Sequence, residues 1–287
     1  MQTVTTIAAL RQSVEDLRVN HGDARQTVAL VPTMGALHDG HLTLIRAARE
    51  KADHVVASIF VNPRQFGEGE DLDAYPRQLA EDTAKLEAEG AALLWAPDVA
   101  AMYPAGYATN ISVSGVSDGL CGADRPGHFD GVATVVCKLF NQVRPDMALF
   151  GEKDWQQLAV IRRMARDLDL SLPHADAIYG VPTVREADGL AMSSRNAYLS
   201  AEQRSAAATL PRAMKEAIAR IVDQQEVMPT LGALEDELLG AGFARVDYSE
   251  MRDADSLEPL TADNGNARLF VAARIGGTRL IDNMPVR

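Results

Sequence analysis

The sequence predicts an α/β protein: a Rossmann-like, doubly wound parallel sheet followed by a smaller C-terminal α+β domain. Short apolar runs alternate with amphipathic helical segments over residues 1–184, as in consecutive βαβ units. Beyond residue 184 the pattern changes to helices followed by strands, which is typical of a small α+β domain. We therefore expect two domains, at residues 1–184 and 185–287.

The first βαβ unit starts at the apolar run Thr27–Val31, which Pro32 is expected to close. From His41 onward, apolar residues recur at helical spacing. The run His54–Val61 is almost continuously apolar, which suits a strand buried on both faces.

Further elements continue the alternation. We expect helices at Tyr75–Glu89, Ala133–Val143 and Asp154–Asp167, and strands at Leu93–Trp95, Met147–Phe150 and Ala175–Val184. In the second region, Ser200–Gln203 is a capping-box pattern that opens a helix to about Val222, and a second helix follows at about Leu231–Leu239. Strands are expected at Ala244–Met251, Ala267–Ile275 and Thr278–Asn283, the last two joined as a hairpin through Gly276 and Gly277.

The composition limits the class of protein. The chain has 287 residues, of which 47% are hydrophobic, and a formal net charge of -12, which disfavours a nucleic-acid partner. Cys121 and Cys137 do not form a CxxC pair, so we expect reduced thiols and no zinc site. Because the sequence has neither a secretory signal nor an apolar run of about 20 residues, we expect a soluble, cytoplasmic protein with no membrane partner.

The stretch Pro32–His41 (PTMGALHDGH) follows a parallel strand at its carboxyl end, where α/β sheets bind ligands. Gly35 and Gly40 let the backbone approach a ligand closely, and the following helix N-terminus favours phosphate. His38 and His41 can face the same way and donate hydrogen bonds to a triphosphate. The alternatives are surface histidines or metal ligands, although no third ligand stands at a diagnostic spacing.

HDGH resembles the HxGH signature of the nucleotidyltransferase superfamily, whose members act on the α-phosphorus of ATP. The full string PTMGALHDGH resembles one family within it, the pantoate–β-alanine ligases (pantothenate synthetases). The resemblance implies a ligase of pantothenate biosynthesis that joins pantoate to β-alanine. It implies a pantoyl-adenylate intermediate, with release of pyrophosphate and then AMP.

A second motif, FVNPRQF, spans Phe60–Phe66 after the next strand and also matches this family. Gln65 offers a donor and an acceptor, which suits a hydroxy acid, although a glutamine in a turn is often simply solvated. The resemblance implies that Gln65 and Gln157 bind pantoate, and that Gln65 later helps to place β-alanine. Met34 and Phe60 are expected to supply apolar walls for pantoate.

A third set lies in Gly151–Leu158 (GEKDWQQL) and Met192–Arg195 (MSSR). Lys153 follows a strand, where a cation can pair with phosphate, whereas Asp154 can instead cap the next helix. MSSR offers two hydroxyls and a guanidinium for phosphate oxygens. It resembles the KMSKS loop of the superfamily but lacks both lysines, which matches the ligase family.

The resemblance implies a full set of site residues. The expected catalytic residues are His38, His41, Lys153 and Arg195. ATP is expected to contact these four and also Met34, Gly35, Gly40, Gly151, Glu152, Asp154, Val184, Met192, Ser193 and Ser194. The string Arg125–Val136 (RPGHFDGVATVV) also resembles the family, and its His128 can touch substrate or anchor a loop.

The resemblance also implies partners. Mg²⁺ is expected to bridge the phosphates of ATP, with Glu81 and Asp82 as candidate ligands carried over from an acidic pair, one position being Glu rather than Asp. The segment Gly67–Asp73 can form a lid over the adenylate or a mobile surface loop. The 185–287 domain is expected to close over the ATP site, and the family implies a homodimer.

Two other functions stay open. Another HxGH adenylyltransferase would carry a second phosphate-binding cluster and would not need FVNPRQF. A non-catalytic nucleotide-binding sensor would keep the fold without turnover, although no motif residue is missing.

Overall fold

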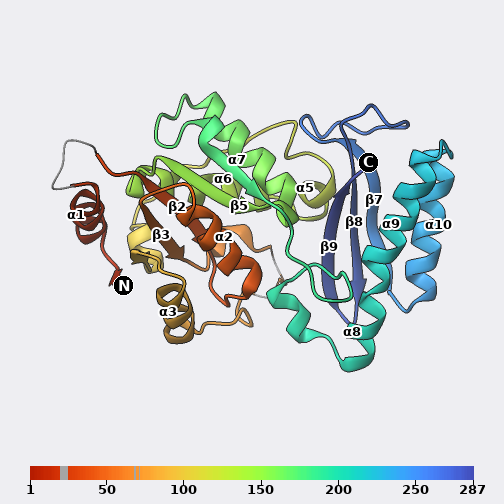
Figure 1. Ribbon diagram of the computed structural model, residues 1–287, viewed down its shortest axis with the longest axis horizontal. Helices are drawn as coiled ribbons and strands as arrows, with labels where there is room; N and C mark the ends of the chain where they lie inside the picture. Colours follow the sequence, from red (N-terminus) through yellow and green to blue (C-terminus); the bar gives the residue numbers. More distant parts are fainter. Residues whose placement is uncertain (20–24, 68, 71) are drawn as a thin grey trace. The chain divides into compact units, whose positions relative to one another are not determined.

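The computed structural model describes residues 1–19, 25–67, 69–70 and 72–287 (Figure 1). The contacts divide the chain into two compact units. Unit 1 comprises Met1–Ser117, Arg125–Glu152 and Gln157–Pro182, and unit 2 comprises Asp118–Asp124, Lys153–Gln156 and Thr183–Arg287. The role expected for the second domain, closing over the ATP site, stays a prediction.

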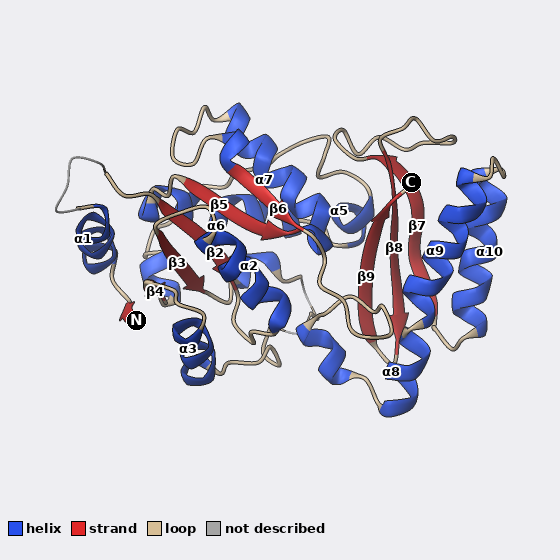
Figure 2. Cartoon of the chain, viewed as in Figure 1, coloured by secondary structure: helices blue, strands red, loops and turns tan. Residues whose placement is uncertain are grey.

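The described residues of unit 1 form a six-stranded parallel sheet in the order β1-β4-β3-β2-β5-β6 (Figure 2). Its strands are β1 Gln2–Val4, β2 Val28–Thr33, β3 His54–Ile59, β4 Leu93–Trp95, β5 Met147–Gly151 and β6 Ile178–Val181. From β2 the chain adds β3 and β4 on one side, then switches to β5 and β6 on the other. The predicted doubly wound parallel sheet is therefore confirmed, and its topological switch point lies between β2 and β5.

Helices cover both faces of this sheet (Figure 1). They are α1 Ile7–Arg18, α2 Asp39–Arg49, α3 Leu79–Ala88, α4 Val99–Met102, α6 His128–Val143 and α7 Trp155–Asp167, the last of which begins in unit 2, with short 3₁₀ turns at Pro63–Gln65, Glu152–Asp154 and Ala175–Ala177. Apolar residues of α2 and α3 pack with Ala29, Val31, Val55 and Ala57 in one buried cluster. On the opposite face, α6 packs through Phe140 against Phe150.

Pro32 was expected to close its strand, and this prediction is wrong. It lies within β2 and pairs with Ser58 of β3. The neighbouring strand β5 pairs with β2 only at Ala29 and Leu30, so the backbone at Pro32 needs no donor toward β5. This exception extends β2 to Thr33, where the histidine loop begins.

The predicted helix Tyr75–Glu89 starts later, at Leu79. Tyr75 precedes a proline and is therefore disfavoured from helical backbone angles. The guanidinium of Arg77 donates to the carbonyl groups of Leu72, Asp73 and Tyr75, which stabilises a non-helical connection. Pro76 thus lies in that connection rather than in the first turn of the helix.

Unit 2, all of whose residues are described, is a three-stranded antiparallel sheet in the order β7-β8-β9, covered by helices. Its elements are α5 Leu120–Asp124, a 3₁₀ turn at Ser194–Tyr198, α8 Ala201–Ala207, α9 Thr209–Val222, α10 Val227–Gly240, β7 Arg245–Asp253, β8 Ala267–Ile275 and β9 Thr278–Pro285. Apolar residues of α9 and α10 share one buried cluster with those of the sheet. The smaller α+β domain and its C-terminal hairpin are confirmed.

The single helix predicted from Ser200 to Val222 is instead two helices. The Ser200–Gln203 capping box is present and opens α8. The proline at position 211 would clash with the carbonyl group of residue i−4, which is Ala207, the last residue of α8. The chain therefore breaks at Ala208 and restarts as α9.

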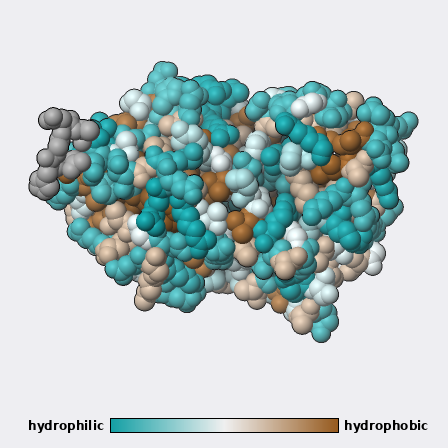
Figure 3. Space-filling view, in the orientation of Figure 1, coloured by the Kyte–Doolittle hydropathy of each residue, from teal (hydrophilic) through white to brown (hydrophobic). Residues whose placement is uncertain are grey.

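On the face shown in Figure 3, hydrophilic side chains predominate and apolar side chains are scattered among them. None of the helices in the described part of the chain has the length and apolar content that a membrane-spanning helix requires.

Candidate functional site

The histidine pair lies at the start of α2 in unit 1. His38 is the N-cap, and its ring centroid is 4.1 Å from that of His41. The backbone N–H of His38 donates to Nδ1 of His41 over a long 3.4 Å. A neutral His41 with this contact carries its proton on Nε2 and is a hydrogen-bond donor through that atom. The two imidazole rings therefore lie together at a helix N-terminus.

The loop before the pair has an unusual backbone. Gly35 and Ala36 have φ values of 87° and 51°, so two consecutive residues adopt the left-handed region. The backbone N–H groups of Ala36 and Leu37 donate to the Asp82 carboxylate at 2.8 Å each. Asp82, which the sequence assigned to magnesium, thus contacts the histidine loop directly.

Gln65 lies at the end of the 3₁₀ turn that FVNPRQF forms. Its Nε2 atom lies 2.9 Å from Sδ of Met34, and its Oε1 atom accepts from Asn62 Nδ2 at 3.1 Å. Tyr103 donates to Oδ1 of Asn62 at 2.8 Å and packs near Phe60, with ring centroids 6.1 Å apart. The structure therefore gathers Met34, Phe60 and Gln65, the three pantoate residues expected from this part of the sequence.

The backbone of Gln65 is held by the RPGH segment. Its carbonyl oxygen lies 2.8 Å from Nδ1 of His128 and accepts from Arg125 at 3.2 Å. Arg125 also forms an ion pair with Glu70 at 2.6 Å. These contacts give His128 the loop-anchoring role, one of the two roles that the sequence left open. The two partners lie 60 and 63 residues from Gln65, too far for any spacing rule to reveal them.

The segment after β5 carries several predicted ATP and pantoate residues. Glu152 and Gln157 are half-buried in unit 1, whereas Lys153 and Asp154 belong to unit 2. Gly180 on β6 allows a close approach, because a Cβ there would lie 2.9 Å from the Glu152 side chain. Lys153 Nζ lies 3.8 Å from Asp154.

In unit 2, the MSSR segment follows a short hairpin. The backbone N–H of Met192 donates to the carbonyl group of Val184 at 3.0 Å, so these two predicted ATP residues are adjacent. Ser193 caps the next 3₁₀ turn by accepting from the N–H of Arg195 at 3.3 Å. Ser194 and Arg195 therefore lie in the first turn of a 3₁₀ helix.

Two adjacent residues of β9 contact the two segments of unit 2 in which the sequence predicts phosphate-binding residues. Asp282 accepts a bidentate pair of hydrogen bonds from Arg185, at 2.6 and 2.9 Å, and Arg185 also donates to the carbonyl group of Gly189 in the hairpin. Asn283 donates to the carbonyl group of Lys153 at 2.8 Å. Sequence reasoning missed both residues: the strand also begins with the polar pair Thr278 and Arg279, so Asp282 and Asn283 did not stand out.

The two cysteines, Cys121 and Cys137, are free and buried. Burial is also the main cause that raises the pKa of the Cys137 thiol. The Cys121 sulfur lies 3.2 Å from the Tyr248 hydroxyl oxygen. The described hydrogen bonds of the two thiol groups are with Tyr248, Asn141 and Arg279, none of which is a predicted site residue.

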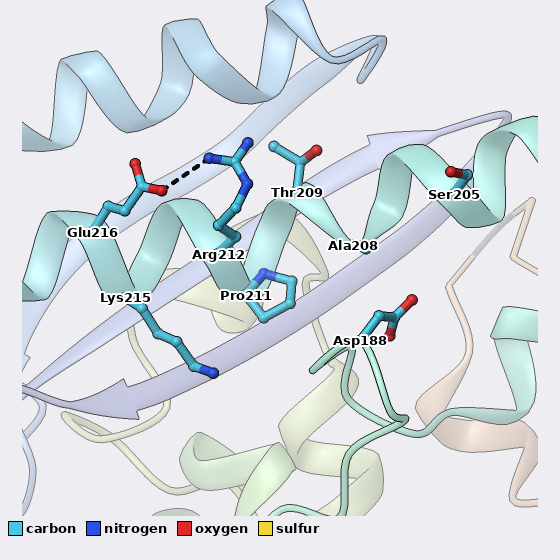
Figure 4. A pocket seen from close by; sticks show the side chains of 8 residues that line it. All are labelled: Asp188, Ser205, Ala208, Thr209, Pro211, Arg212, Lys215 and Glu216. Atoms are coloured by element: carbon cyan, nitrogen blue, oxygen red, sulfur yellow. Dashed lines mark hydrogen bonds and ion pairs between the residues drawn. The ribbon is translucent and has the colours of Figure 1, made fainter.

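A pocket of about 510 Å³ lies in unit 2 beside α9 (Figure 4). It is lined by Asp188, Ser205, Ala208, Thr209, Pro211, Arg212, Lys215 and Glu216. Arg212 is paired with Glu216 at 2.9 Å, and Asp188 with Arg204 at 2.6 Å. None of the predicted site residues lines this pocket, so it does not mark the candidate site.

The chain is similar along its whole length to proteins of one family. A sequence model described as pantoate-beta-alanine ligase matches residues 2–285. A pantothenate synthetase from Novosphingobium aromaticivorans is 68% identical over 287 residues, which cover 100% of this chain and 99% of that protein.

Solved structures agree. The crystal structure of pantothenate synthetase from Thermus thermophilus has a TM-score of 0.90 and 47% identity, over 100% of this chain and 99% of that one. A pantoate-beta-alanine ligase from Francisella tularensis, complexed with beta-gamma ATP and beta-alanine, has a TM-score of 0.80 and 32% identity, over 100% of this chain and 98% of that one. This chain belongs to the pantoate–β-alanine ligase family.

Proposed function

We propose that His38 and His41 act on the phosphates of ATP when this chain joins pantoate to β-alanine. The ligase activity, with ATP as a substrate, follows from the family. The observation that carries the residue assignment is the histidine pair at the start of α2, beside the switch point of the sheet. There, helix N–H groups and an Nε2 donor favour negative charge that develops on phosphate.

The reaction needs no nucleophile from the protein. A carboxylate oxygen of pantoate attacks the α-phosphorus of ATP, and the bond to pyrophosphate breaks. The β-alanine amine then attacks the carbonyl carbon of the pantoyl-adenylate, losing a proton, and AMP leaves. Catalysis therefore depends on positioning the reactants and stabilising charge, to which hydrogen bonds from His38 and His41 contribute.

The remaining ATP contacts are assigned to both units. Lys153 and Arg195 supply positive charge toward phosphate oxygens, with the hydroxyls of Ser193 and Ser194 as further donors. The other proposed ATP contacts are Met34, Gly35, Gly40, Gly151, Glu152, Asp154, Val184 and Met192. Unit 2 is proposed to close over ATP as part of this binding.

Pantoate is assigned to Gln65 and Gln157, with Met34 and Phe60 as apolar walls. The contacts of Gln65 with Asn62 and Met34 support this assignment, because they orient its amide before substrate arrives. Fixing that amide in advance reduces the entropy lost on binding.

Glu81 and Asp82 do not fit a shared magnesium site. Both Asp82 oxygens accept backbone N–H groups, and the residue is 1% exposed. Glu81 is paired with Lys85 at 2.7 Å. Within the described ranges, no cluster of three or more His, Cys, Asp or Glu could hold a metal ion. We therefore propose that Mg²⁺ is bound by the ATP phosphates, and we assign no step to an ion held by the protein.

Two further assignments belong to this proposal. The chain is expected to form a homodimer and to act in the cytoplasm. For Gly67–Asp73, a lid over the adenylate and a mobile surface loop stay the two alternatives; Glu68 and Asp71 of that segment lie outside the described residues. Equal proteolytic cleavage of the segment with and without ATP plus pantoate would contradict the lid.

Exchange of labelled pyrophosphate into ATP, with and without pantoate, tests the proposed chemistry. Wild-type protein should exchange only with pantoate. His41→Ala should reduce the rate at least about 100-fold, because it removes a donor toward the reacting phosphate. His174→Ala, an exposed histidine of the same unit, is the matched control and should exchange normally.

The alternatives give different results in the same assay. Exchange that depends on another substrate indicates a different adenylyltransferase, and ATP binding without exchange indicates a sensor. Near-normal exchange by folded His41→Ala protein would refute the role given to this histidine.

A further inference from the structure

Asp82 is a buried carboxylate to which the reaction above gives no part. It lies in the first turn of α3 and is 1% exposed. A charged group at that depth needs strong partners to be tolerated. Its partners are all in unit 1, and they identify what the residue does.

The carboxylate accepts from two consecutive backbone amides of the histidine loop. Oδ2 accepts from the N–H of Ala36 and Oδ1 from that of Leu37, each at 2.8 Å. Both loop residues are buried, so these amides require acceptors inside the protein. Gln78 donates to Oδ1 at 3.3 Å and steadies the carboxylate.

The same helix also holds the carbonyl side of this loop. Lys85, one turn after Asp82, donates from Nζ to the carbonyl oxygen of Leu37 at 2.9 Å. The exposed Glu81 also pairs with Lys85 at 2.7 Å, but a surface pair of this kind contributes little to holding the loop. Side chains of helix α3 therefore bind both the N–H and the carbonyl group of Leu37, the residue directly before His38.

The loop needs this support because its backbone is strained. Ala36 has a φ of 51°, a left-handed conformation that disfavours residues with a Cβ. At Gly35, a Cβ would lie 3.1 Å from Oδ2 of Asp82 and 3.2 Å from the Ile59 side chain, so the carboxylate sits close against the turn. Charge-assisted hydrogen bonds offset the strain and select one loop conformation.

We propose that Asp82 is a positioning residue for the ligase reaction: its carboxylate fixes the turn Gly35–Leu37 and thereby the place of His38 and His41. The inference rests on the proposed function, which assigns these histidines to ATP. It replaces the expectation that Asp82 binds magnesium.

The test compares Asp82→Asn with Glu81→Gln. Asparagine keeps one acceptor but turns an NH₂ group toward a backbone N–H, so the loop loses a hydrogen bond and gains a donor–donor contact. We expect kcat of pantoate-dependent exchange to fall about 10- to 100-fold in Asp82→Asn, with a smaller change in the KM for ATP. Raising Mg²⁺ should not restore it, and Glu81→Gln should behave like wild type.

A second readout does not depend on turnover. In nitrogen-15 NMR spectra of the histidine rings, Asp82→Asn should shift the signals of His38 and His41, whereas Glu81→Gln should not. Asp53→Asn is the matched control, since Asp53 also accepts a backbone N–H, that of Thr27, at the opposite end of β2. It should leave both the rings and kcat unchanged.

A double variant keeps the test informative if Asp82→Asn folds poorly. Adding Ala36→Gly relieves the positive φ and should recover part of the lost rate. Unchanged histidine signals, or activity restored by Mg²⁺ in both acidic variants, would overturn the inference. If wild-type protein shows no exchange, the proposed function fails, and the histidine spectra still decide whether Asp82 fixes the loop.

Discussion

At Gly131 of α6, the turn that is proposed to bind pantoate lies directly against the helix. A Cβ at this position would lie 2.8 Å from the backbone nitrogen of Gln65 and closer still to the carbonyl group of Arg64. Asn62 donates to the carbonyl oxygen of Gly131 at 3.1 Å across the same gap. The position therefore requires the absence of a side chain, because the neighbouring atoms are backbone and cannot rotate away.

Gly131→Ala should push the turn away from α6. We expect a loss of about 1 to 3 kcal/mol in the free energy of unfolding and a higher KM for pantoate, with a smaller effect on ATP. Urea unfolding and steady-state kinetics measure the two effects. Gly232→Ala is the control: this glycine lies within α10 with open space around its Cβ position, so alanine should stabilise by up to about 1 kcal/mol. Similar effects of both substitutions would contradict the packing argument.

Single residues could be predicted from the sequence where their own chain neighbours position them. His38 and His41 share one helix turn, so their spacing alone indicated that they face the same way. Asp82 accepts from amides 45 and 46 residues away, and that pairing has no spacing signal. The family resemblance implied a metal ligand at Asp82, whereas tertiary packing uses its carboxylate to hold the backbone of the histidine loop.

At the scale of elements, β9 organises the segments of unit 2 that are proposed to bind phosphate. The side chain of Asp282 is fully buried and paired with Arg185 of the hairpin. Asn283 accepts from Arg268, whose guanidinium lies 3.6 Å from the centroid of the Trp155 ring. The C-terminal hairpin, in which the sequence revealed no motif, thus supports Lys153 and the MSSR segment through backbone and ion-pair contacts.

Asp282→Asn should leave the Arg185 guanidinium without its counter-ion in a buried setting. Breaking such a pair costs about 3 to 5 kcal/mol, so unit 2 should unfold at a lower urea concentration. Fluorescence of Trp155, in a Trp95→Phe background, reports on this unit. The KM for ATP should rise as the hairpin loosens. Asp236→Asn, an exposed carboxylate on α10, serves as the control, and equal midpoints for the two variants would contradict the prediction.

Element types were predicted better than element limits. The strands β3, β4 and β5 follow from apolar runs because a doubly covered parallel sheet buries both faces. The limit at Pro32 depends on pairing with neighbouring strands, which the sequence pattern does not contain, whereas the break at Ala208 follows from Pro211 and was readable from the sequence. Strand β1 was not predicted, because its three residues pair with β4, some 90 residues later. Helix α1 was not predicted either, although Thr6 is a local N-cap signal for it.

For the whole molecule, the free energy of unfolding is expected to fall in acid, because many carboxylates ionise more readily in the folded state than in the unfolded state. The pKa is lowered at Asp53, Glu70, Glu87, Asp146, Asp188, Glu202, Asp247 and Asp253. Glu235 has the opposite shift, because burial raises its pKa. At Asp146, burial alone would raise the pKa, but hydrogen bonds from Val28 and Arg18 outweigh it. Carboxylates with a lowered pKa outnumber those with a raised pKa and occur in both units. Acid should therefore destabilise each unit.

Asp253 makes this expectation specific. At the end of β7 it accepts from the N–H groups of Ser256 and Asp255 and from Asn264, and these bonds lower its pKa from 3.8 to about 2, the bond from Ser256 most. A depressed folded-state pKa gives stability that is complete above the unfolded value of 3.8 and is lost as pH falls toward 2. Because Asp253 is half-buried near the surface, where solvent screens its interactions, its share is below about 1 kcal/mol. Urea unfolding between pH 5 and 2.5 should show a shallower loss of stability for Asp253→Asn than for wild type. Asp167→Asn, which changes an exposed carboxylate of α7, is the control and should follow wild type. Parallel curves for all three proteins would exclude Asp253 as a source of the acid sensitivity.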